Sequence, residues 1–289
     1  MEEATRKLLF EVRLLHFNQK IKVIKIVKKS KLRLAGAFIH ALRRVVPKKI
    51  YVSAVILAAG SGTRMNAGVT KQWLELRGRP LFAVSLAQFQ LCPKIKEIIL
   101  CVKEDEKELF ADVRERYGIT KLKAVVVGGN TRADSALCGF KKISDKATHV
   151  AIHDAARCLV TPEMIDAVIK KAVLYGSATA ACRATDTVKL ATEDDLILST
   201  PDRKTVWQAQ TPQIFETEIY RASAYLAREK GIEVTDDCSM VENAGFKIKL
   251  VDCGKENLKI TEPIDLYFAE AVLKMQSDTM KREHRKAKI

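Results

Sequence analysis

The chain has 289 residues, 47% of them hydrophobic, with 50 Lys and Arg against 35 Asp and Glu. This composition excludes a mostly disordered or collagen-like chain, and the length allows one large α/β domain or two small ones. The longest uncharged stretch of the basic N-terminal part is residues 34–42, far short of the roughly 20 residues of a membrane-spanning helix. Seven cysteines, an odd number without a C-x-x-C pair, predict reduced and mostly buried thiols in a cytoplasmic protein.

The excess positive charge lies at the two ends of the chain. Residues 1–50 carry 14 Lys and Arg against 3 Asp and Glu, and residues 274–289 carry 6 against 2, which leaves 30 of each sign between them. A domain that binds nucleic acid usually carries its basic residues on its folded face. We therefore expect no nucleic-acid partner, and a division into a basic extension (1–50), a central domain (51–275) and a basic tail (276–289).

The N-terminal extension interleaves apolar and basic side chains, partly at helical spacing. Three interpretations stay open: a helical extension packed on its own domain, which we favour, weak contact of residues 1–50 with an anionic membrane surface, or a basic arm that touches RNA. Glu11 and Arg13 interrupt the apolar run and no small-residue cleavage site follows it, so we expect no secretory signal.

Strands and helices are predicted to alternate from residue 51 to residue 182. Residues 51–58 (YVSAVILA) form a continuous apolar run, rich in β-branched residues, that is typical of a strand buried on both faces. Further strands are expected at 98–102, 124–127, 149–153 and 178–182, and helices at 80–91, 104–117, 133–143 and 162–175. Repeated βα units of this length predict an α/β fold with a three-layer, doubly wound, mostly parallel sheet.

The last third of the chain differs from this alternation. Residues 184–215 lack a clear helix and predict an excursion from the sheet, a protruding β-arm at about 184–206. Helices are expected to return at 216–229, 237–244 and 263–275.

A glycine-rich loop, LAAGSGTRM at 57–65, follows the first strand. Small residues let the backbone approach a ligand closely, and consecutive N–H groups in a turn bind anions. The loop is neither a Walker A motif nor a dinucleotide fingerprint. It predicts an anion site at the carboxyl end of the strand, where open α/β sheets bind ligands. Its candidate residues are four small residues and two cations: Ala58, Ala59, Gly60, Gly62, Arg64 and Lys71.

The loop and six later motifs together resemble one family of nucleotidyltransferases. The later motifs are GGNTRADS at 128–135, IHDAAR at 152–157, DTVK at 186–189, WQAQTPQ at 207–213, TDDCS at 235–239 and NLKIT at 257–261. The series resembles the 2-C-methyl-D-erythritol 4-phosphate cytidylyltransferases of the non-mevalonate isoprenoid pathway. The resemblance spans about residues 51–275 and implies a Rossmann-like nucleotidyltransferase fold, CTP as co-substrate, CMP transfer with release of pyrophosphate, and Mg²⁺ as the divalent cation.

The resemblance also implies a role for each matching position. Arg64 and Lys71 are expected to act on the transferring phosphoryl group, and Arg203 and Lys259 to position the acceptor phosphate. Further residues implied to bind CTP, in part by reading cytosine, are Gly129, Asn130, Arg132 and Ser135. Those implied to bind substrate are Asp154, Ala155, Arg157, Thr187 and Thr211.

In the family the arm wraps around a second subunit, so Thr187 and Arg203 imply a homodimer with arm exchange. Two positions depart from the family pattern: Asn130 replaces a common acid, and Cys158 replaces a usual Pro. Neither change removes a group that the reaction needs, because Asn keeps an acceptor and Pro carries no functional group.

Several alternatives stay open. A ribitol-5-phosphate cytidylyltransferase has nearly the same motifs and differs in its acceptor pocket. A non-catalytic adaptor that binds nucleic acid or a membrane surface through the basic extension would have no need of the four cations. His153 is either a satisfied strand residue or a base, and Asp236 and Asp237 either cap a helix or contact substrate. No residue is assigned as a direct metal ligand.

Overall fold

The computed structural model describes residues 49–60 and 70–286, with side chains through residue 277. Residues 1–48 of the basic extension, Gly62 and Arg64 lie outside the described residues.

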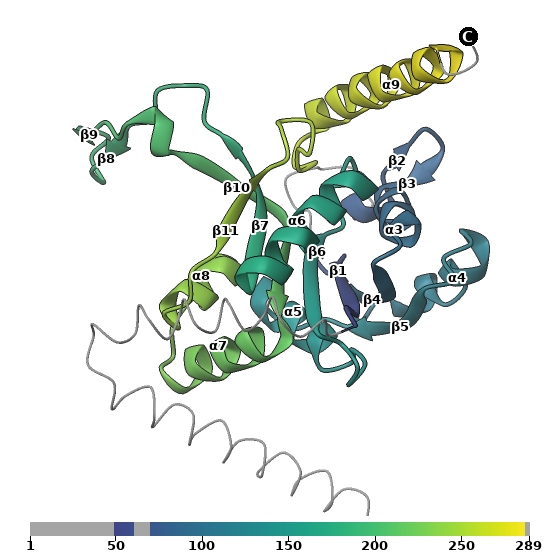
Figure 1. Ribbon diagram of the computed structural model, residues 1–289, viewed down its shortest axis with the longest axis horizontal. Helices are drawn as coiled ribbons and strands as arrows, with labels where there is room; N and C mark the ends of the chain where they lie inside the picture. Colours follow the sequence, from purple (N-terminus) through teal and green to yellow (C-terminus); the bar gives the residue numbers. More distant parts are fainter. Residues whose placement is uncertain (1–48, 61–69, 287–289) are drawn as a thin grey trace, which may run out of the picture. The chain divides into compact units, whose positions relative to one another are not determined.

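A seven-stranded sheet forms the centre of the domain, in the order β11-β7-β10-β6-β1-β4-β5 (Figure 1). Only β10 runs antiparallel to its neighbours, β6 and β7, and the other pairs are parallel. The predicted mostly parallel, doubly wound α/β sheet is therefore confirmed. The strands are β1 (Val52–Leu57), β4 (Ile95–Val102), β5 (Leu122–Val127), β6 (His149–Asp154), β7 (Ser177–Arg183), β10 (Trp207–Glu216) and β11 (Lys249–Asp252).

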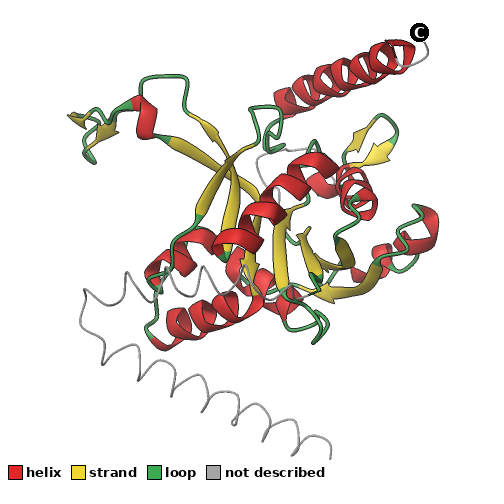
Figure 2. Cartoon of the chain, in the orientation of Figure 1, coloured by secondary structure: helices red, strands yellow, loops and turns green. Residues whose placement is uncertain are grey.

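Helices cover both faces of the sheet (Figure 2). Successive side chains of β1 explain why two cores form, because they point to opposite faces: Ala54 and Ile56 enter one core and Val55 the other. The first core is closed by α3 (Leu81–Leu91) and α6 (Pro162–Tyr175), and the second by α5 (Arg132–Phe140), α7 (Thr217–Glu229) and α8 (Asp237–Asn243).

The ends of α6 follow directly from the sequence. The Thr161 side chain accepts a hydrogen bond from the backbone N–H of Met164, and Pro162 occupies the first turn, where its missing N–H costs nothing. Gly176 ends the helix with a φ of 85°, a left-handed conformation that favours glycine.

The prediction of a helix over 104–117 is wrong. The segment holds a single 3-10 turn, η3 (Lys107–Phe110), and a single α turn, α4 (Val113–Arg116). Phe110 and Val113 are its only fully buried apolar side chains, and Leu109 is exposed. Short helices depend on tertiary packing for their stability, and two apolar contacts support two turns rather than a continuous helix.

Two hairpins are separate from the central sheet. β2 (Glu75–Leu76) and β3 (Arg79–Pro80) flank a turn at Arg77 and Gly78, both with positive φ. β8 (Leu190–Ala191) and β9 (Ile197–Ser199) pair at the tip of the arm, which leaves the sheet from β7 and returns through β10 (Figure 1).

The C-terminal helix α9 (Pro263–Lys286) runs past the predicted end at residue 275. Its residues Leu266, Val272 and Leu273 pack against a third cluster that includes Leu159 and Ile260. This packing joins the helix to the segments that follow β6 and precede α9.

Candidate active site

The carboxyl ends of four parallel strands meet at one edge of the sheet. Leu57, the last residue of β1, pairs with Asp154, the last residue of β6. The backbone N–H of Ala58 donates to Cys101 on β4, and that of Gly128, after β5, donates to Val102. The segments that follow β1, β5 and β6 therefore begin side by side, as the motif positions predicted.

Asp154 holds two cations that come from distant parts of the sequence. Its Oδ1 accepts a hydrogen bond from Arg132 Nε at 3.1 Å, and its Oδ2 lies 2.8 Å from Lys259 Nζ. Burial by itself would raise the pKa of the Asp154 carboxyl, but Arg132 and Lys259 outweigh burial and hold that pKa well below its ordinary value. The carboxylate therefore stays ionised and fixes both cations at this edge.

Arg132 lies in the first turn of α5 and bridges two carboxylates. A capping box of Thr131 and Asp134 forms the start of this helix. Arg132 Nη1 donates to Asp237 Oδ2 at 2.6 Å in addition to its bond with Asp154. Burial lowers the pKa of the guanidinium, but the two carboxylates more than compensate and raise it above its ordinary value.

The two acids of the TDDCS motif have different roles. Asp236 caps α8, because its carboxylate accepts from the backbone N–H of Ser239 at 2.8 Å, which confirms the capping interpretation for this residue. Asp237 is buried and pairs with Arg132, and it also accepts from the Tyr220 hydroxyl at 2.7 Å. The motif signalled Asp237 without its partner, and no sequence signal pointed to Tyr220.

His153 has a hydrogen-bond partner at each ring nitrogen, and burial keeps its ring neutral. The backbone N–H of Asp154 donates to Thr211 Oγ1 at 3.1 Å, Thr211 Oγ1 lies 2.9 Å from His153 Nδ1, and His153 Nε2 lies 3.2 Å from the Arg157 carbonyl. A carbonyl only accepts, so Nε2 carries a proton, and in the neutral ring Nδ1 accepts from the Thr211 hydroxyl. Burial lowers the pKa of His153 to about 3, so of the two interpretations of His153 the satisfied strand residue is confirmed.

Arg157 links β6 to the segment that carries Lys259. Its Nη1 donates to the Asn257 carbonyl at 2.9 Å and its Nη2 to the Ala209 carbonyl at 3.2 Å. Asn257 in turn donates to Thr211 O at 2.9 Å. The backbone at Asn257, two residues before Lys259, is thus tied to the segment after β6 and, through the Asn257 side chain, to β10.

The turn between β5 and α5 requires glycine. A Cβ on Gly128 would lie 2.6 Å from Ser135 Oγ, and a Cβ on Gly129 would collide with the side chain of Asp134. Ser135 Oγ accepts from the backbone N–H of Gly129 at 3.1 Å. Gly129 and Asn130 are exposed, so this turn presents polar groups at the sheet edge where β1, β5 and β6 end.

One side chain joins the segment that follows the signature loop to the described start of that loop. Lys71 begins a 3-10 turn, η2 (Lys71–Trp73), and Gln72 Nε2 donates to the Gly60 carbonyl at 2.9 Å. Ala155, on the neighbouring β6 loop, is buried and its backbone N–H donates to Leu57 O at 3.0 Å. Ala58, Ala59 and Gly60 lie between these contacts.

Thr187 and Arg203 lie on the arm rather than with Asp154. Both are exposed, and Arg203 Nη1 donates to the Thr185 carbonyl within the arm at 2.8 Å. Among the described residues, no contact joins either of them to the Asp154 cluster. The described chain therefore does not bring Thr187 and Arg203 together with the other predicted substrate-binding residues.

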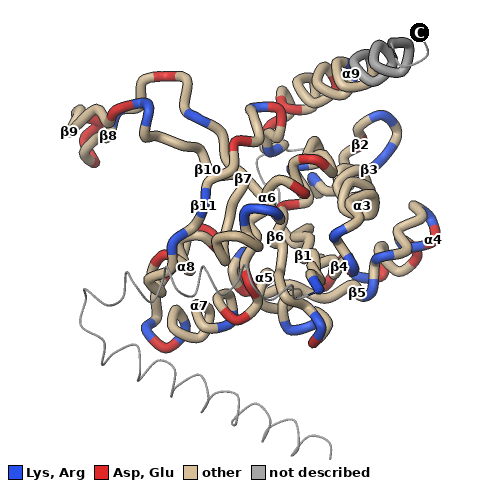
Figure 3. Tube along the Cα trace, in the orientation of Figure 1, with Lys and Arg blue, Asp and Glu red and all other residues tan. Residues whose placement is uncertain are grey.

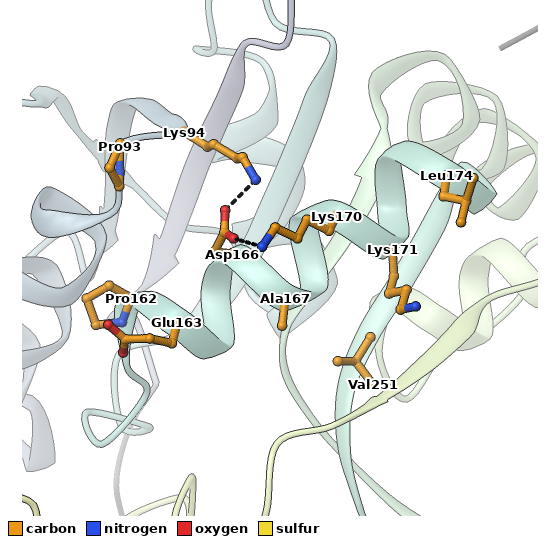
Figure 4. A pocket seen from close by; sticks show the side chains of 10 residues that line it. All are labelled: Pro93, Lys94, Pro162, Glu163, Asp166, Ala167, Lys170, Lys171, Leu174 and Val251. Carbon is orange, nitrogen blue, oxygen red and sulfur yellow. Dashed lines mark ion pairs between the residues drawn. The ribbon is translucent and has the colours of Figure 1, made fainter. Parts of the chain in front are cut away.

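Two other features of the described surface do not mark the site. A cavity of about 830 Å³ runs along α6, and none of the predicted site residues lines it. Two lysines that line this cavity, Lys94 and Lys170, point toward Asp166, 2.5 and 2.8 Å away, so their charges are already paired (Figure 4). Basic and acidic residues are interspersed along the described chain (Figure 3). Charge alone therefore does not single out a binding face.

Known proteins resemble this chain across its central domain. The family model of 2-C-methyl-D-erythritol 4-phosphate cytidylyltransferase (IspD) matches residues 52–275. The 2-C-methyl-D-erythritol 4-phosphate cytidylyltransferase of Caldanaerobacter subterraneus subsp. tengcongensis is 43% identical over 224 residues, which cover 77% of this chain and 99% of the relative. The corresponding protein of Pelotomaculum thermopropionicum is 40% identical, with 77% and 94% covered.

A solved structure agrees with these matches. The 4-diphosphocytidyl-2C-methyl-D-erythritol synthase from Anaerococcus prevotii has a TM-score of 0.70 and 30% identity, and the match covers 78% of this chain and 96% of that one. The nucleotidyltransferase fold implied by the motifs is thereby confirmed. The chain belongs to the 2-C-methyl-D-erythritol 4-phosphate cytidylyltransferase family.

Proposed function

We propose that the chain transfers CMP from CTP to 2-C-methyl-D-erythritol 4-phosphate, giving 4-diphosphocytidyl-2-C-methyl-D-erythritol and pyrophosphate in isoprenoid precursor synthesis. The observation that supports this most directly is the pairing of Asp154 with Arg132 and Lys259 beside the glycine turn of β5. These cations lie at the sheet edge where a family member would bind two phosphorylated reactants.

In the proposed reaction, a phosphate oxygen of the acceptor attacks the α-phosphorus of CTP. The bond from the α-phosphorus to the oxygen that bridges it to the β-phosphate breaks, and pyrophosphate leaves with the electron pair. A phosphate monoester carries most of its second negative charge at pH 7, since its second pKa is about 6. The step therefore needs no general base, which fits the buried and neutral His153.

The main barrier to such a transfer is repulsion between the two anionic reactants. Fixed cations and oriented N–H groups stabilise the charge that develops on the transferring phosphoryl group. We assign this role to Lys71 and Arg64. The positioning of the acceptor phosphate is assigned to Lys259 and to Arg203 of a second chain. Arg suits the last role because its planar guanidinium binds phosphate through two hydrogen bonds.

The remaining predicted contacts are proposed at the same edge. The turn that holds Gly129, Asn130, Arg132 and Ser135 would read cytosine, and Ala58, Ala59, Gly60 and Gly62 would offer backbone to the triphosphate. Asp154, Ala155, Arg157, Thr187 and Thr211 would complete the substrate contacts.

Mg²⁺ is proposed to arrive with the triphosphate. Among the described residues, no three His, Cys, Asp or Glu side chains cluster as a metal cage, and both oxygens of Asp154 already contact cations. Mg²⁺ commonly binds through substrate phosphates with few protein ligands, so the phosphate oxygens of CTP would supply its anionic ligands here. When bound, the ion would neutralise triphosphate charge.

We also propose that the protein is a cytoplasmic homodimer with exchanged arms. The arm tip exposes Leu196, Ile197 and Leu198, each more than 60% accessible, and a contiguous exposed apolar patch marks an interaction site.

The cysteines support the proposed cytoplasmic location. Six of the seven are buried, as the sequence predicted. No helix in the described part of the chain is long and apolar enough to cross a bilayer.

A pyrophosphate-release assay tests the proposed function. The purified full chain is given CTP, MgCl₂ and either 2-C-methyl-D-erythritol 4-phosphate or ribitol 5-phosphate. We expect release with the first acceptor, and Lys71→Ala should lower kcat by roughly 10²–10³, the usual cost of losing one such electrostatic contact. The exposed Lys107→Ala serves as the matched control. Release with ribitol 5-phosphate alone would establish the other acceptor, and release with neither would refute the proposal.

A further inference from the structure

Glu106 is a buried carboxylate that the proposed reaction does not use. It lies between β4 and η3 and is 7% exposed. Its Oε1 accepts a hydrogen bond from Thr70 Oγ1 at 2.5 Å, whereas Oε2 is buried without a partner among the described residues. Burying a carboxylate oxygen without a donor destabilises a fold. A carboxylate kept in such a place calls for a compensating role.

Thr70 immediately precedes Lys71 at the N-cap position of η2. A threonine in this position ordinarily accepts a hydrogen bond from a backbone N–H of the first turn. Thr70 makes no such capping bond, and its hydroxyl bonds instead to Glu106, 36 residues further along the chain. The side chain is therefore used to anchor the loop to the β4 connection rather than to cap its own helix.

The residues that follow Lys71 are anchored as well. Gln72 is buried and donates to the Gly60 carbonyl at 2.9 Å. The Trp73 ring packs 5.0 Å from Phe82 and 4.9 Å from Phe110, measured between ring centroids. The Lys71 backbone is thus held from both sides.

We propose that Glu106 is a positioning residue that holds Lys71 in place through Thr70. The inference rests on the role proposed above for Lys71 in phosphoryl transfer. An ammonium group that stabilises a transition state must be held to within a fraction of an ångström, and a displacement of about 1 Å can cost as much as 10² in rate. Removing the Thr70–Glu106 bond frees one end of the η2 turn and so displaces that group.

Substitutions at Thr70 test this role while leaving the buried volume nearly unchanged. Thr70→Val, which lacks the hydroxyl, should lower kcat by roughly ten- to a hundredfold with a smaller change in the KM for CTP. Thr70→Ser keeps the hydroxyl and should restore most of the activity. Glu106→Ala should match Thr70→Val, and the exposed Glu108→Ala on the same turn is its control.

The Lys71→Ala background separates positioning from a general structural effect. If Thr70 acts through Lys71, Thr70→Val should change the residual kcat of Lys71→Ala by less than about twofold, since coupled residues are not additive. An equal loss in both backgrounds, or a Thr70→Ser variant as impaired as Thr70→Val, would overturn the positioning role. Wild-type turnover by Lys71→Ala itself would instead refute the role proposed for Lys71. Thermal unfolding of Thr70→Val identifies any variant that has lost its fold.

Discussion

His153 shows how neighbouring residues determine the charge of a buried side chain. It directly precedes Asp154, is fully buried, and has a hydrogen-bond partner at each ring nitrogen. Burial lowers the pKa of His153 to about 3, whereas an unfolded chain binds the same proton at about 6.5. The stability that comes from the neutral ring is therefore complete above pH 6.5 and is lost as the pH falls toward 3.

Replacing this ring should flatten the acid dependence of stability. Between pH 6.5 and pH 5, His153 should remove about 1.6 kcal/mol from the free energy of unfolding, since one bound proton contributes about 1.4 kcal/mol per pH unit and the unfolded ring is half protonated at pH 6.5. His153→Gln does not titrate and keeps a donor toward the Arg157 carbonyl. Urea unfolding at the two pH values should show a smaller drop for His153→Gln than for the wild type. Equal drops would show that this ring does not remain neutral in the folded chain.

The arm carries two predicted site residues that lie apart from the Asp154 cluster of the same chain. Arg203 and Thr187 are exposed, and among the described residues Arg203 donates to the Thr185 carbonyl within the arm. If the arm completes a neighbour's site, Arg203→Ala and Lys71→Ala disable the two halves of a shared site. Each variant alone should then be nearly inactive, because both sites of a symmetric dimer carry the defect.

Mixing these two variants should restore activity. Random exchange gives mixed dimers in half of the population, each with one intact site, so about a quarter of the wild-type rate is expected. The measurement is pyrophosphate release after co-expression of the two chains with different tags and purification through both tags in turn, which isolates the mixed dimers and raises the expectation to about half. Continued inactivity of purified mixed dimers would mean that Arg203 does not serve a neighbour's site.

Elements with strong local signals could be predicted from the sequence. The apolar run of β1, and α6 between its Thr161 cap and Gly176, needed only local chemistry. The edge strand β11 has one half-buried and three exposed residues, so no apolar pattern marked it. The helix expected at 104–117 failed because its amphipathic pattern lacked enough apolar side chains to pack.

The residues of the candidate site could likewise be predicted only in part. Motifs predicted which strand ends carry Asp154 and Gly129, and the parallel sheet brings these ends together. Lys259 came only from the family resemblance, because a lone lysine has no local signature. Tyr220 and Glu106 were missed, since each acts on a partner that only the fold brings near: Asp237 for the tyrosine, and Thr70 for the glutamate.

At the scale of the whole molecule, the net charge and the fold belong to different parts of the chain. Residues 51–273 are neutral, with 30 basic and 30 acidic residues, and the family match spans residues 52–275. The described chain is anchored from its beginning, because the Tyr51 N–H donates to Thr148 Oγ1 at 3.1 Å and Ile50 packs on the first core. The contacts that start β1 are therefore made by Ile50 and Tyr51 and do not involve residues 1–48.

Removing residues 1–48 should leave catalysis intact and should separate the interpretations of the extension. We expect kcat/KM for both substrates to change by less than about twofold, because a domain with its own core folds and works independently. Binding to anionic lipid vesicles distinguishes a membrane role, since a polybasic segment near the surface contributes about 1 kcal/mol per Lys or Arg and is screened by salt. Salt-sensitive vesicle binding by the full chain that the truncated chain lacks would assign the extension to a membrane surface. A truncated chain that is folded but inactive would instead place part of the extension in the active site.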